Sequence, residues 1–377
     1  MPRLTKHLSA ALRPHNDEGA IATIVAIVLA GGVLMGILAL SVDVGQLYAE
    51  RRQLQNGADA ASLAVAQDCA AGKPCDAGTS ASSVAGQYAN SNSNDNVSQV
   101  TNVCGRGRST LAACAAPSAS IYDCPALPAS PTSVVQVRTA TLTSGGSTLL
   151  PPTFARLLLG NSAYPGKTVT ACAQAAWGPP KSVRSTLPVT ISLCEWQRYT
   201  TSGTNYAPPP PYSSYPSSYE RALYLHNTTG ATSCPAGPSG FDLPGGFGWL
   251  NSSNCIANVD ANSWVNDNTG VSINTDCKGV IAGLVGTVIY IPIYDDTNNL
   301  NGANGSYHIQ QFAAFYLTGY NLPAAQPNSV RSIASGTAYC KGSDKCLYGW
   351  FTTGTVPDDG GIGTGPSLGA NIGQLVG

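Results

Sequence analysis

An apolar run near the start of the chain is the first feature of its hydrophobic pattern. No charged residue lies between Ala20 and Val42. As a helix with a rise of about 1.5 Å per residue, this run would span roughly 34 Å, which is enough to cross the hydrocarbon core of a bilayer. A cleaved signal peptide is the alternative, because Ala39-Leu40-Ser41 is a weak cleavage site. The apolar core of a signal peptide is normally only about 7–15 residues long, so the pattern favours a retained transmembrane helix.

The helical pattern continues beyond the apolar run as a narrow apolar stripe among polar residues. No proline occurs between Pro14 and Pro74, which predicts one helix over residues 17–72. The stripe recurs at helical spacing and consists of Leu47, Leu54, Ala58, Ala61 and Val65. Either the helix is a stalk covered by the protein's own body, or part of the stripe binds a second protein. Within the span, Gly32 and Gly36 form a G-x-x-x-G pair, which lets helix backbones approach closely in lipid.

Charge and cysteine distribution predict the orientation of the span. The cytoplasmic segment is expected to be residues 1–16, with the basic side chains Arg3, Lys6 and Arg13. All 12 cysteines lie C-terminal to the span, from Cys69 to Cys346, and no C-x-x-C pair occurs. An even number of dispersed cysteines is typical of disulfides formed in an oxidising compartment. The sequence therefore predicts a single-pass protein of the cell membrane with a cytoplasmic N-terminus and an extracytoplasmic body.

The apolar run and the segment that follows it resemble a known family. The stretch SVDVGQLYAERRQLQNGADAASLA follows DEGAIATIVAIVLAGGVLMGILAL directly. Over about residues 17–70 the chain resembles the N-terminal region of TadG-like proteins of the tight-adherence (Flp) pilus systems of bacteria. The resemblance implies a membrane-anchored component of pilus assembly or adhesion, and it brings no catalytic residues. Two family features are missing: Gly19 lacks the glutamate five residues on that a prepilin peptidase reads, and no D-x-S-x-S metal motif occurs.

After Pro74 the pattern changes to short alternating segments separated by turn residues. Strands are expected at 97–104, 134–142, 167–177, 189–193, 222–226, 280–294 and 307–318, and helices at 81–88 and 149–160. These elements predict a small α+β unit at 73–180, with its helices on one face of a sheet. Residues 181–355 are expected to form a strand-rich, disulfide-stabilised unit, and the Gly-rich residues 356–377 a flexible tail. The predicted fold class is therefore α+β, behind a transmembrane helix that continues as a long amphipathic helix.

The cysteines are the most interpretable chemistry in the chain, although sequence alone does not determine their pairing. Close spacing suggests Cys69–Cys75, Cys104–Cys114 and Cys340–Cys346. The guesses for the remaining cysteines are Cys255–Cys277, Cys194–Cys234 and Cys124–Cys172. Each closed loop would contribute roughly 2–4 kcal/mol and would offset the weak ordering tendency of so much Gly and Ser.

Composition and motifs exclude several classes of function. Only 10% of residues are charged and the net charge is −1, so the chain has no field that would attract nucleic acid. Ser367 lies in a G-x-S-x-G sequence, but within the Gly-rich tail and without the strand and helix that a nucleophile elbow needs. His308 is expected to be a hydrogen-bonded sheet residue and Glu195 a packed structural one. The oxygen-rich residues 294–302 lack the glutamate of a calcium loop. No enzyme, cofactor or metal site is expected.

These observations predict a membrane-anchored structural or assembly component. It would act in Flp-type pilus assembly or surface adhesion through protein–protein contacts. Its partners would be the lipid bilayer and other pilus-assembly or envelope proteins. A homo-oligomer is possible but is not indicated. The alternative is a membrane-tethered module that binds glycan or wall polymer, because residues 200–220 form a loop rich in Tyr, Pro and Ser.

Overall fold

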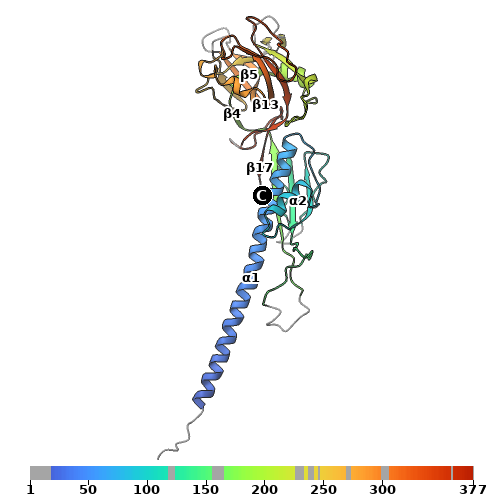
Figure 1. Ribbon diagram of the computed structural model, residues 1–377, viewed down its shortest axis with the longest axis vertical. Coiled ribbons are helices and arrows are strands. Elements are labelled where there is room, and N and C mark those ends of the chain that lie inside the picture. Colours follow the sequence, from blue (N-terminus) through green and yellow to red (C-terminus); the bar gives the residue numbers. More distant parts are fainter. Residues whose placement is uncertain are drawn as a thin grey trace, which may run out of the picture. The chain divides into compact units, whose positions relative to one another are not determined.

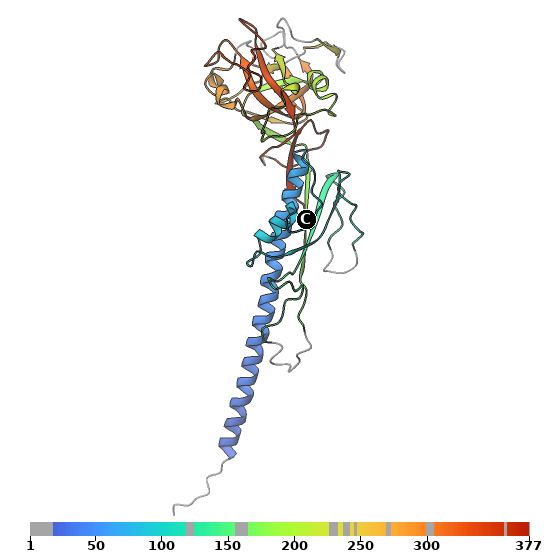
Figure 2. The ribbon, with the colours of Figure 1, turned by 45° about the vertical axis from the view of Figure 1, so that its right-hand side comes forward.

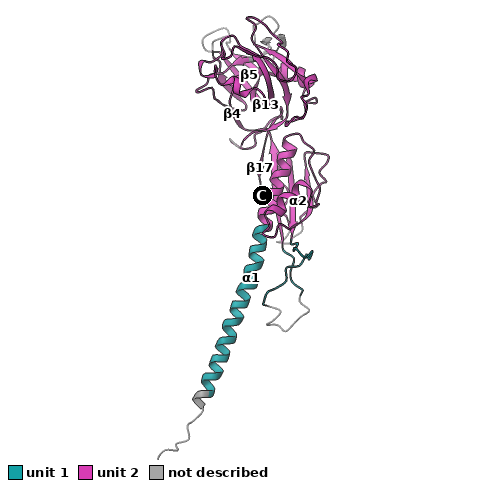
Figure 3. Ribbon diagram, viewed as in Figure 1, with its two compact units in different colours: residues 1–53, 141–169 teal, residues 54–140, 170–377 magenta. Residues whose placement is uncertain are grey.

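The computed structural model consists of a long N-terminal helix and a strand-rich body (Figure 1). It describes residues 18–117, 124–154, 165–225, 233–236, 242–244, 247–268, 273–298, 305–357 and 360–376. The fold is α+β, as the sequence predicts. The chain divides into two compact units, residues 1–53 with 141–169 and residues 54–140 with 170–377 (Figure 3).

Helix α1 (Glu18–Ala70) has no proline and ends in a hydrogen-bonded cap. The Lys73 N–H donates to the Asp68 carbonyl at 3.0 Å, and the Gly72 N–H donates to the Cys69 carbonyl at 3.3 Å. Gly72 has φ of +74°. This is the Schellman arrangement, in which a residue in the left-handed region satisfies the last carbonyls of a helix. Gly72 therefore ends the helix two residues before Pro74.

The first sheet packs against the second part of α1 (Figure 2). Among the described residues it has five strands in the order β1 (Gln99–Arg106), β2 (Ser133–Ala140), β3 (Thr170–Gly178), β17 (Ala370–Leu375) and β16 (Gly354–Thr355). Neighbouring strands are antiparallel except for the parallel pair β16–β17. The short helix α2 (Val84–Ser91) begins at Ser83, whose hydroxyl accepts from the Gly86 N–H. Residues of α1, α2, β1, β2 and β3 share one apolar core.

A second, larger sheet forms most of the remaining body. Within the described residues its main path is β6 (Arg221–Tyr224), β15 (Cys346–Thr352), β13 (Ser306–Asn321), β12 (Val288–Asn298), β5 (Val189–Ser192) and β9 (Phe247–Trp249). Strands β11 (Ser263–Asn266) and β14 (Ser329–Val330) also pair with β13. Its core includes Trp249, Ile291 and Phe315, each at most 2% exposed. β-branched and aromatic residues at alternating positions explain why these segments form strands.

Short elements complete the description of the body. They are β4 (Ser182–Ser185) paired with β10 (Ala257–Asp260), β7 (Ser233–Ala236) paired with β8 (Asp242–Pro244), the helices α4 (Leu193–Thr200) and α5 (Ile281–Leu284), and the 3₁₀ turns η1 (Ser217–Tyr219) and η2 (Thr275–Cys277).

Three expectations from the sequence differ from the structure. The C-terminal residues do not form a flexible tail, because β17 pairs with β3 and buries Ala370 and Ile372. The apolar residues 280–294 begin as the short helix α5 before β12. Residues 149–154 of the expected helix at 149–160 are not helical, and its remainder lies outside the described residues.

The unit boundaries expected at 72/73 and 180/181 stay predictions. The second part of α1 shares an apolar core with the first sheet, whereas residues 141–169 group with the first part of the helix.

Candidate interaction surfaces

The first part of α1 exposes a continuous apolar surface. Its large side chains are strongly exposed, for example Ile27 at 65%, Leu34 at 67% and Leu40 at 66%. The most apolar window has a mean hydropathy of 2.6, and none of it is buried. Among the described residues, α1 is the one helix long and apolar enough to cross a membrane. A soluble protein would not leave such a surface uncovered, and the chain is a single-pass membrane protein.

The G-x-x-x-G pair lies within this exposed surface. A Cβ atom built on Gly32 or on Gly36 would meet nothing within 4 Å. The space beside both glycines is therefore open to a neighbouring helix or to lipid. That a partner helix occupies it stays a prediction.

The apolar stripe beyond the membrane has a different environment. Leu54 is 3% exposed, and Ala58, Ala61 and Val65 are completely buried. Ala61 and Val65 belong to the apolar core shared with β1, β2 and β3, and the Thr139 hydroxyl donates to the Leu54 carbonyl at 2.9 Å. These four residues are therefore covered by the protein's own body, as in the first of the two interpretations. Leu47, in the other compact unit, is half-buried.

Side chains from distant segments hold the end of α1. The Asn371 amide donates to the Ala70 carbonyl at 2.9 Å, and the Thr353 hydroxyl donates to the Ala71 carbonyl at 2.6 Å. Arg108 donates to the Cys69 carbonyl at 2.9 Å. These contacts satisfy carbonyl groups that a helix end leaves without partners. No sequence pattern indicates them, because each pair is far apart along the chain.

Disulfides join the cysteines in the body. The described bridges are Cys69–Cys75, Cys104–Cys114, Cys124–Cys172, Cys255–Cys277 and Cys340–Cys346. These five coincide with pairs expected from the sequence. Cys194 is also disulfide-bonded, whereas the side chain of its expected partner Cys234 lies outside the described residues. Bridges near α1, in the first sheet and in the larger sheet place oxidised cysteines throughout the body.

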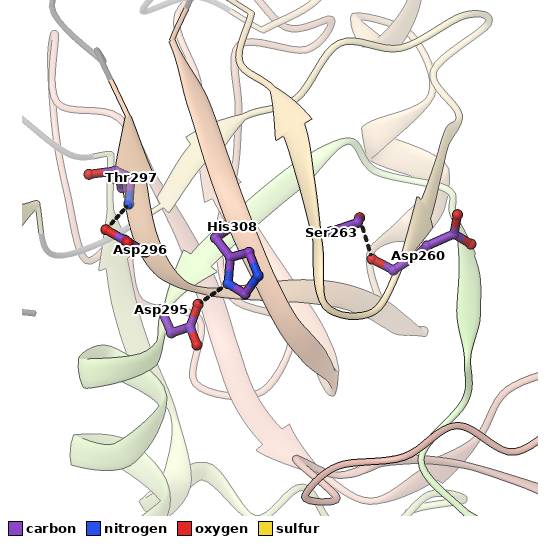
Figure 4. Close-up of polar contacts among 6 residues, drawn as sticks. All are labelled: Asp260, Ser263, Asp295, Asp296, Thr297 and His308. Carbon is purple, nitrogen blue, oxygen red and sulfur yellow. Dashed lines mark hydrogen bonds and ion pairs between the residues drawn. The ribbon is translucent and has the colours of Figure 1, made fainter. Parts of the chain in front are cut away.

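His308 and Asp295 form the main acid–base pair that the structure describes (Figure 4). Strand β12 shifts register between Tyr294 and Asp296, and the intervening Asp295 reaches His308 on β13. The distance from Asp295 Oδ1 to His308 Nδ1 is 2.6 Å. The Trp264 ring lies 5.3 Å from the His308 ring and is 52% exposed. This is a hydrogen-bonded sheet histidine, as expected from its alternating position.

The other candidate catalytic residues have structural partners. The Ser367 hydroxyl donates to Asn371 at 2.8 Å, and Ser367 is exposed in a loop before β17. Glu195 lies in the first turn of α4, is 3% exposed and forms a hydrogen bond with Tyr199. Within the described part of the chain, no group of three or more His, Cys, Asp or Glu side chains could hold a metal ion.

The Tyr/Pro/Ser-rich loop packs its aromatic rings on the larger sheet. Tyr316 and Trp350 stack with centroids 5.0 Å apart and an interplanar angle of 10°. Tyr212 meets Tyr316 edge-on, and its hydroxyl accepts from the Trp350 indole at 3.0 Å. Trp350 is 1% exposed, whereas Tyr215, on the outside of this cluster, is 39% exposed. The cluster therefore stabilises the loop and presents mainly Tyr215 to solvent.

Glu220 forms a buried polar network that the sequence does not reveal. Its carboxylate accepts hydrogen bonds from Thr318, from Ser332 at 2.5 Å, from Ser335 at 2.8 Å and from Tyr339 at 2.7 Å. Burial by itself would raise the pKa of Glu220, but the four hydroxyl donors outweigh it and lower the pKa below its usual value. A buried charge satisfied in this way connects the start of β6 with β13 and the loop after β14.

Comparison with known proteins identifies the N-terminal region. Residues 19–68 match the model of the family described as "Putative Flp pilus-assembly TadE/G-like". This is a family of assembly proteins rather than enzymes. No curated protein matches the chain, and no solved structure matches it either. Residues 19–68 are therefore similar to this family, and this similarity supports an involvement of the protein in Flp pilus assembly.

Proposed function

We propose that this protein is a membrane-anchored assembly component of an Flp-type pilus or adhesion apparatus, which acts by binding other proteins. The observation that carries the proposal is the coincidence of two features in one helix. The TadE/G-like match at residues 19–68 covers an exposed apolar segment and its direct continuation into a disulfide-bonded body. An assembly role, rather than catalysis, is supported by the nature of that family.

The proposed orientation has the N-terminus in the cytoplasm and the body outside the membrane. Disulfides form and persist in oxidising compartments. The described bridges all lie C-terminal to the apolar run Ala20–Val42. The body that carries them would therefore face the cell surface, where adhesion or pilus assembly takes place.

The proposed partner surface is the open face of the span at Gly32 and Gly36. A partner helix that approaches these glycines would gain van der Waals contact, because small residues permit close backbone approach in lipid. The extracytoplasmic stripe is not proposed as a partner surface from Leu54 onward, because the protein's own body covers it.

The test is in-cell crosslinking of the full chain in which Gly32 and Gly36 are both replaced by leucine. We expect normal membrane insertion, since the span becomes more apolar, but reduced recovery of pilus-system proteins. The matched control replaces Gly31 and Met35 by leucine, which has the same spacing on a neighbouring face of the helix. Unchanged partner recovery in the Gly32/Gly36 variant would remove the membrane interface and leave a simple tether.

A further inference from the structure

The connection between β2 and β3 is a long excursion rather than a tight turn. Residues 141–169 group with the first part of α1 in one compact unit (Figure 3). Its two ends pair: the Thr141 N–H donates to the Val169 carbonyl at 2.9 Å, and Leu150 and Lys167 exchange backbone hydrogen bonds of 3.0 and 3.2 Å. Gly166 has φ of +120°, and a Cβ there would lie 2.2 Å from the Leu150 carbonyl oxygen. The described part of this segment is therefore built as an ordered arm.

The far part of this arm is hydrogen-bonded to one position on α1. The Asp43 carboxylate accepts from the Thr153 N–H at 2.7 Å and from the Phe154 N–H at 3.0 Å. The Thr153 hydroxyl donates to the Gln46 side-chain oxygen at 2.9 Å. Backbone and side chain of the arm thus bind two helix residues that lie three positions apart on one face.

Asp43 occupies a special place in the sequence. It is the first charged residue after the apolar run Ala20–Val42. A run of this length matches the hydrocarbon thickness of about 30 Å, which puts Asp43 at the boundary between acyl chains and headgroups. A carboxylate is costly in such a poorly hydrated layer unless donors satisfy it. The two N–H groups of the arm are such donors, so the arm is tied to the helix at the depth of the interface.

The side chains next to these hydrogen bonds are of a kind that favours the interfacial layer. Phe154 is 38% exposed, and Tyr48, little more than one turn beyond Asp43 on α1, is 67% exposed. Aromatic side chains favour the membrane–water interface, where apolar rings leave water without entering the bilayer centre. Contact of its ring with lipid therefore accounts for an exposed phenylalanine side chain at this depth.

We propose that residues 149–154 make a second contact with the bilayer, in which Phe154 enters the interfacial layer while Asp43 holds the arm in place. The proposal rests on the membrane anchoring proposed above and adds to it a surface contact outside the helix. Such a contact would restrict the tilt and rotation of the stalk relative to the membrane plane.

The test uses the full-length protein in phospholipid vesicles that contain a phospholipid with a photoreactive diazirine near the headgroup end of its acyl chain. After illumination, labelled peptides are mapped by mass spectrometry. We expect label in residues 20–42 and also in residues 149–154. Phe154→Ser and Asp43→Ala should each reduce the label in the arm several-fold, whereas Phe154→Leu, which keeps an apolar side chain, should retain it. The matched control is Tyr88→Ser, which removes an exposed aromatic side chain on α2 and should not change the pattern.

Label confined to residues 20–42 would overturn the proposal and leave the helix as the only membrane contact. Crosslinks of the arm to protein in place of lipid would also overturn it and assign the arm to a partner. Absence of label from residues 20–42 themselves would instead overturn the membrane anchoring, and the second contact with it. These outcomes separate a failure of this proposal from a failure of the proposed function.

Discussion

At the scale of single residues, Glu220 is a carboxylate buried inside the body of a chain that has few charged residues. The side chain is 4% exposed and accepts hydrogen bonds from four hydroxyl groups. Buried carboxylates are tolerated only when such donors replace the lost water. The network holds the start of β6 against β13 and the loop of residues 332–339.

Glu220→Gln is expected to lower the free energy of unfolding by about 1.5–3 kcal/mol at pH 7, the range for hydrogen bonds to a charged group. The folded protein holds the pKa of Glu220 below 4.5. The ionised carboxylate therefore stabilises the fold fully above that pH. This stabilisation is lost as the pH falls through the pKa that Glu220 has in the folded protein. The stability difference between wild type and variant should therefore shrink below about pH 4.5. Thermal unfolding of both detergent-solubilised proteins between pH 7 and pH 3 measures this stability difference.

The matched control is Asp260→Asn, because the carboxylate of Asp260 is exposed and only its backbone carbonyl accepts the Ser263 hydroxyl. It should leave the unfolding midpoint unchanged at every pH. Equal effects of both variants, or an effect of Glu220→Gln that does not depend on pH, would contradict a charged network.

Residues differ in how far sequence alone predicts their roles. The close cysteine pairs and the sheet histidine follow from local spacing and alternation. Glu220, Asn371 and Asp43 could not be predicted, because their partners are brought close only by the fold. The sequence also does not distinguish Leu54 from Leu47 on the apolar stripe, although the body buries only the first of them.

At the scale of elements, α1 has two parts with opposite environments. Its first part is exposed and apolar, and from Leu54 onward one face is packed into the first sheet. The sequence differs accordingly: the first part is apolar on every side, whereas the second carries a narrow apolar stripe among polar residues.

Leu54→Ala should destabilise the body by about 2–5 kcal/mol, since it removes buried apolar volume from a site that cannot fully collapse. The control Asn56→Ala changes an exposed position of the same helix and should have little effect. Near-ultraviolet circular dichroism during thermal unfolding of the full chain compares them. If Leu54→Ala unfolds like wild type but loses partner crosslinks, the face binds another protein instead.

Strand β17 is the element that the sequence predicts least well. Its short segment follows a Gly-rich stretch, which favours a flexible tail, and its partner β3 lies far earlier in the chain. The structure pairs Ile372 with Gly178 and buries its side chain to 2% exposure. Long-range strand pairing is invisible to local propensity, because burial decides whether such a segment is a strand.

Ile372→Asp should lower the free energy of unfolding by about 3–5 kcal/mol, because it leaves an uncompensated charge in an apolar site. Leu375→Asp on the same strand should have little effect, since Leu375 is 46% exposed. A stop codon after Gly369 should destabilise the protein at least as much as Ile372→Asp. Wild-type unfolding midpoints for the truncated chain would show that the C-terminus is a tail after all.

At the scale of the whole molecule, the chain joins an apolar helix, within the region similar to the TadE/G-like family, to a disulfide-bonded body. The α+β class, the span and the disulfide-rich body could be predicted from the sequence, because each has a strong pattern of its own. The grouping of residues 141–169 with the first part of α1 could not, because it arises from contacts between segments far apart along the chain. The central claim is that one retained helix carries the oxidised body across the membrane.

Protease treatment of intact spheroplasts that express the chain with different epitope tags at its two ends tests this claim most directly. We predict that the body is digested from outside, and that a membrane-bound fragment keeps the N-terminal tag and the span at residues 20–42. A tag on the C-terminus should be lost unless the body resists the protease, in which case the tag should be accessible to antibody without lysis. A C-terminal tag that is accessible only after lysis, or a soluble product that begins near Val42, would contradict the account.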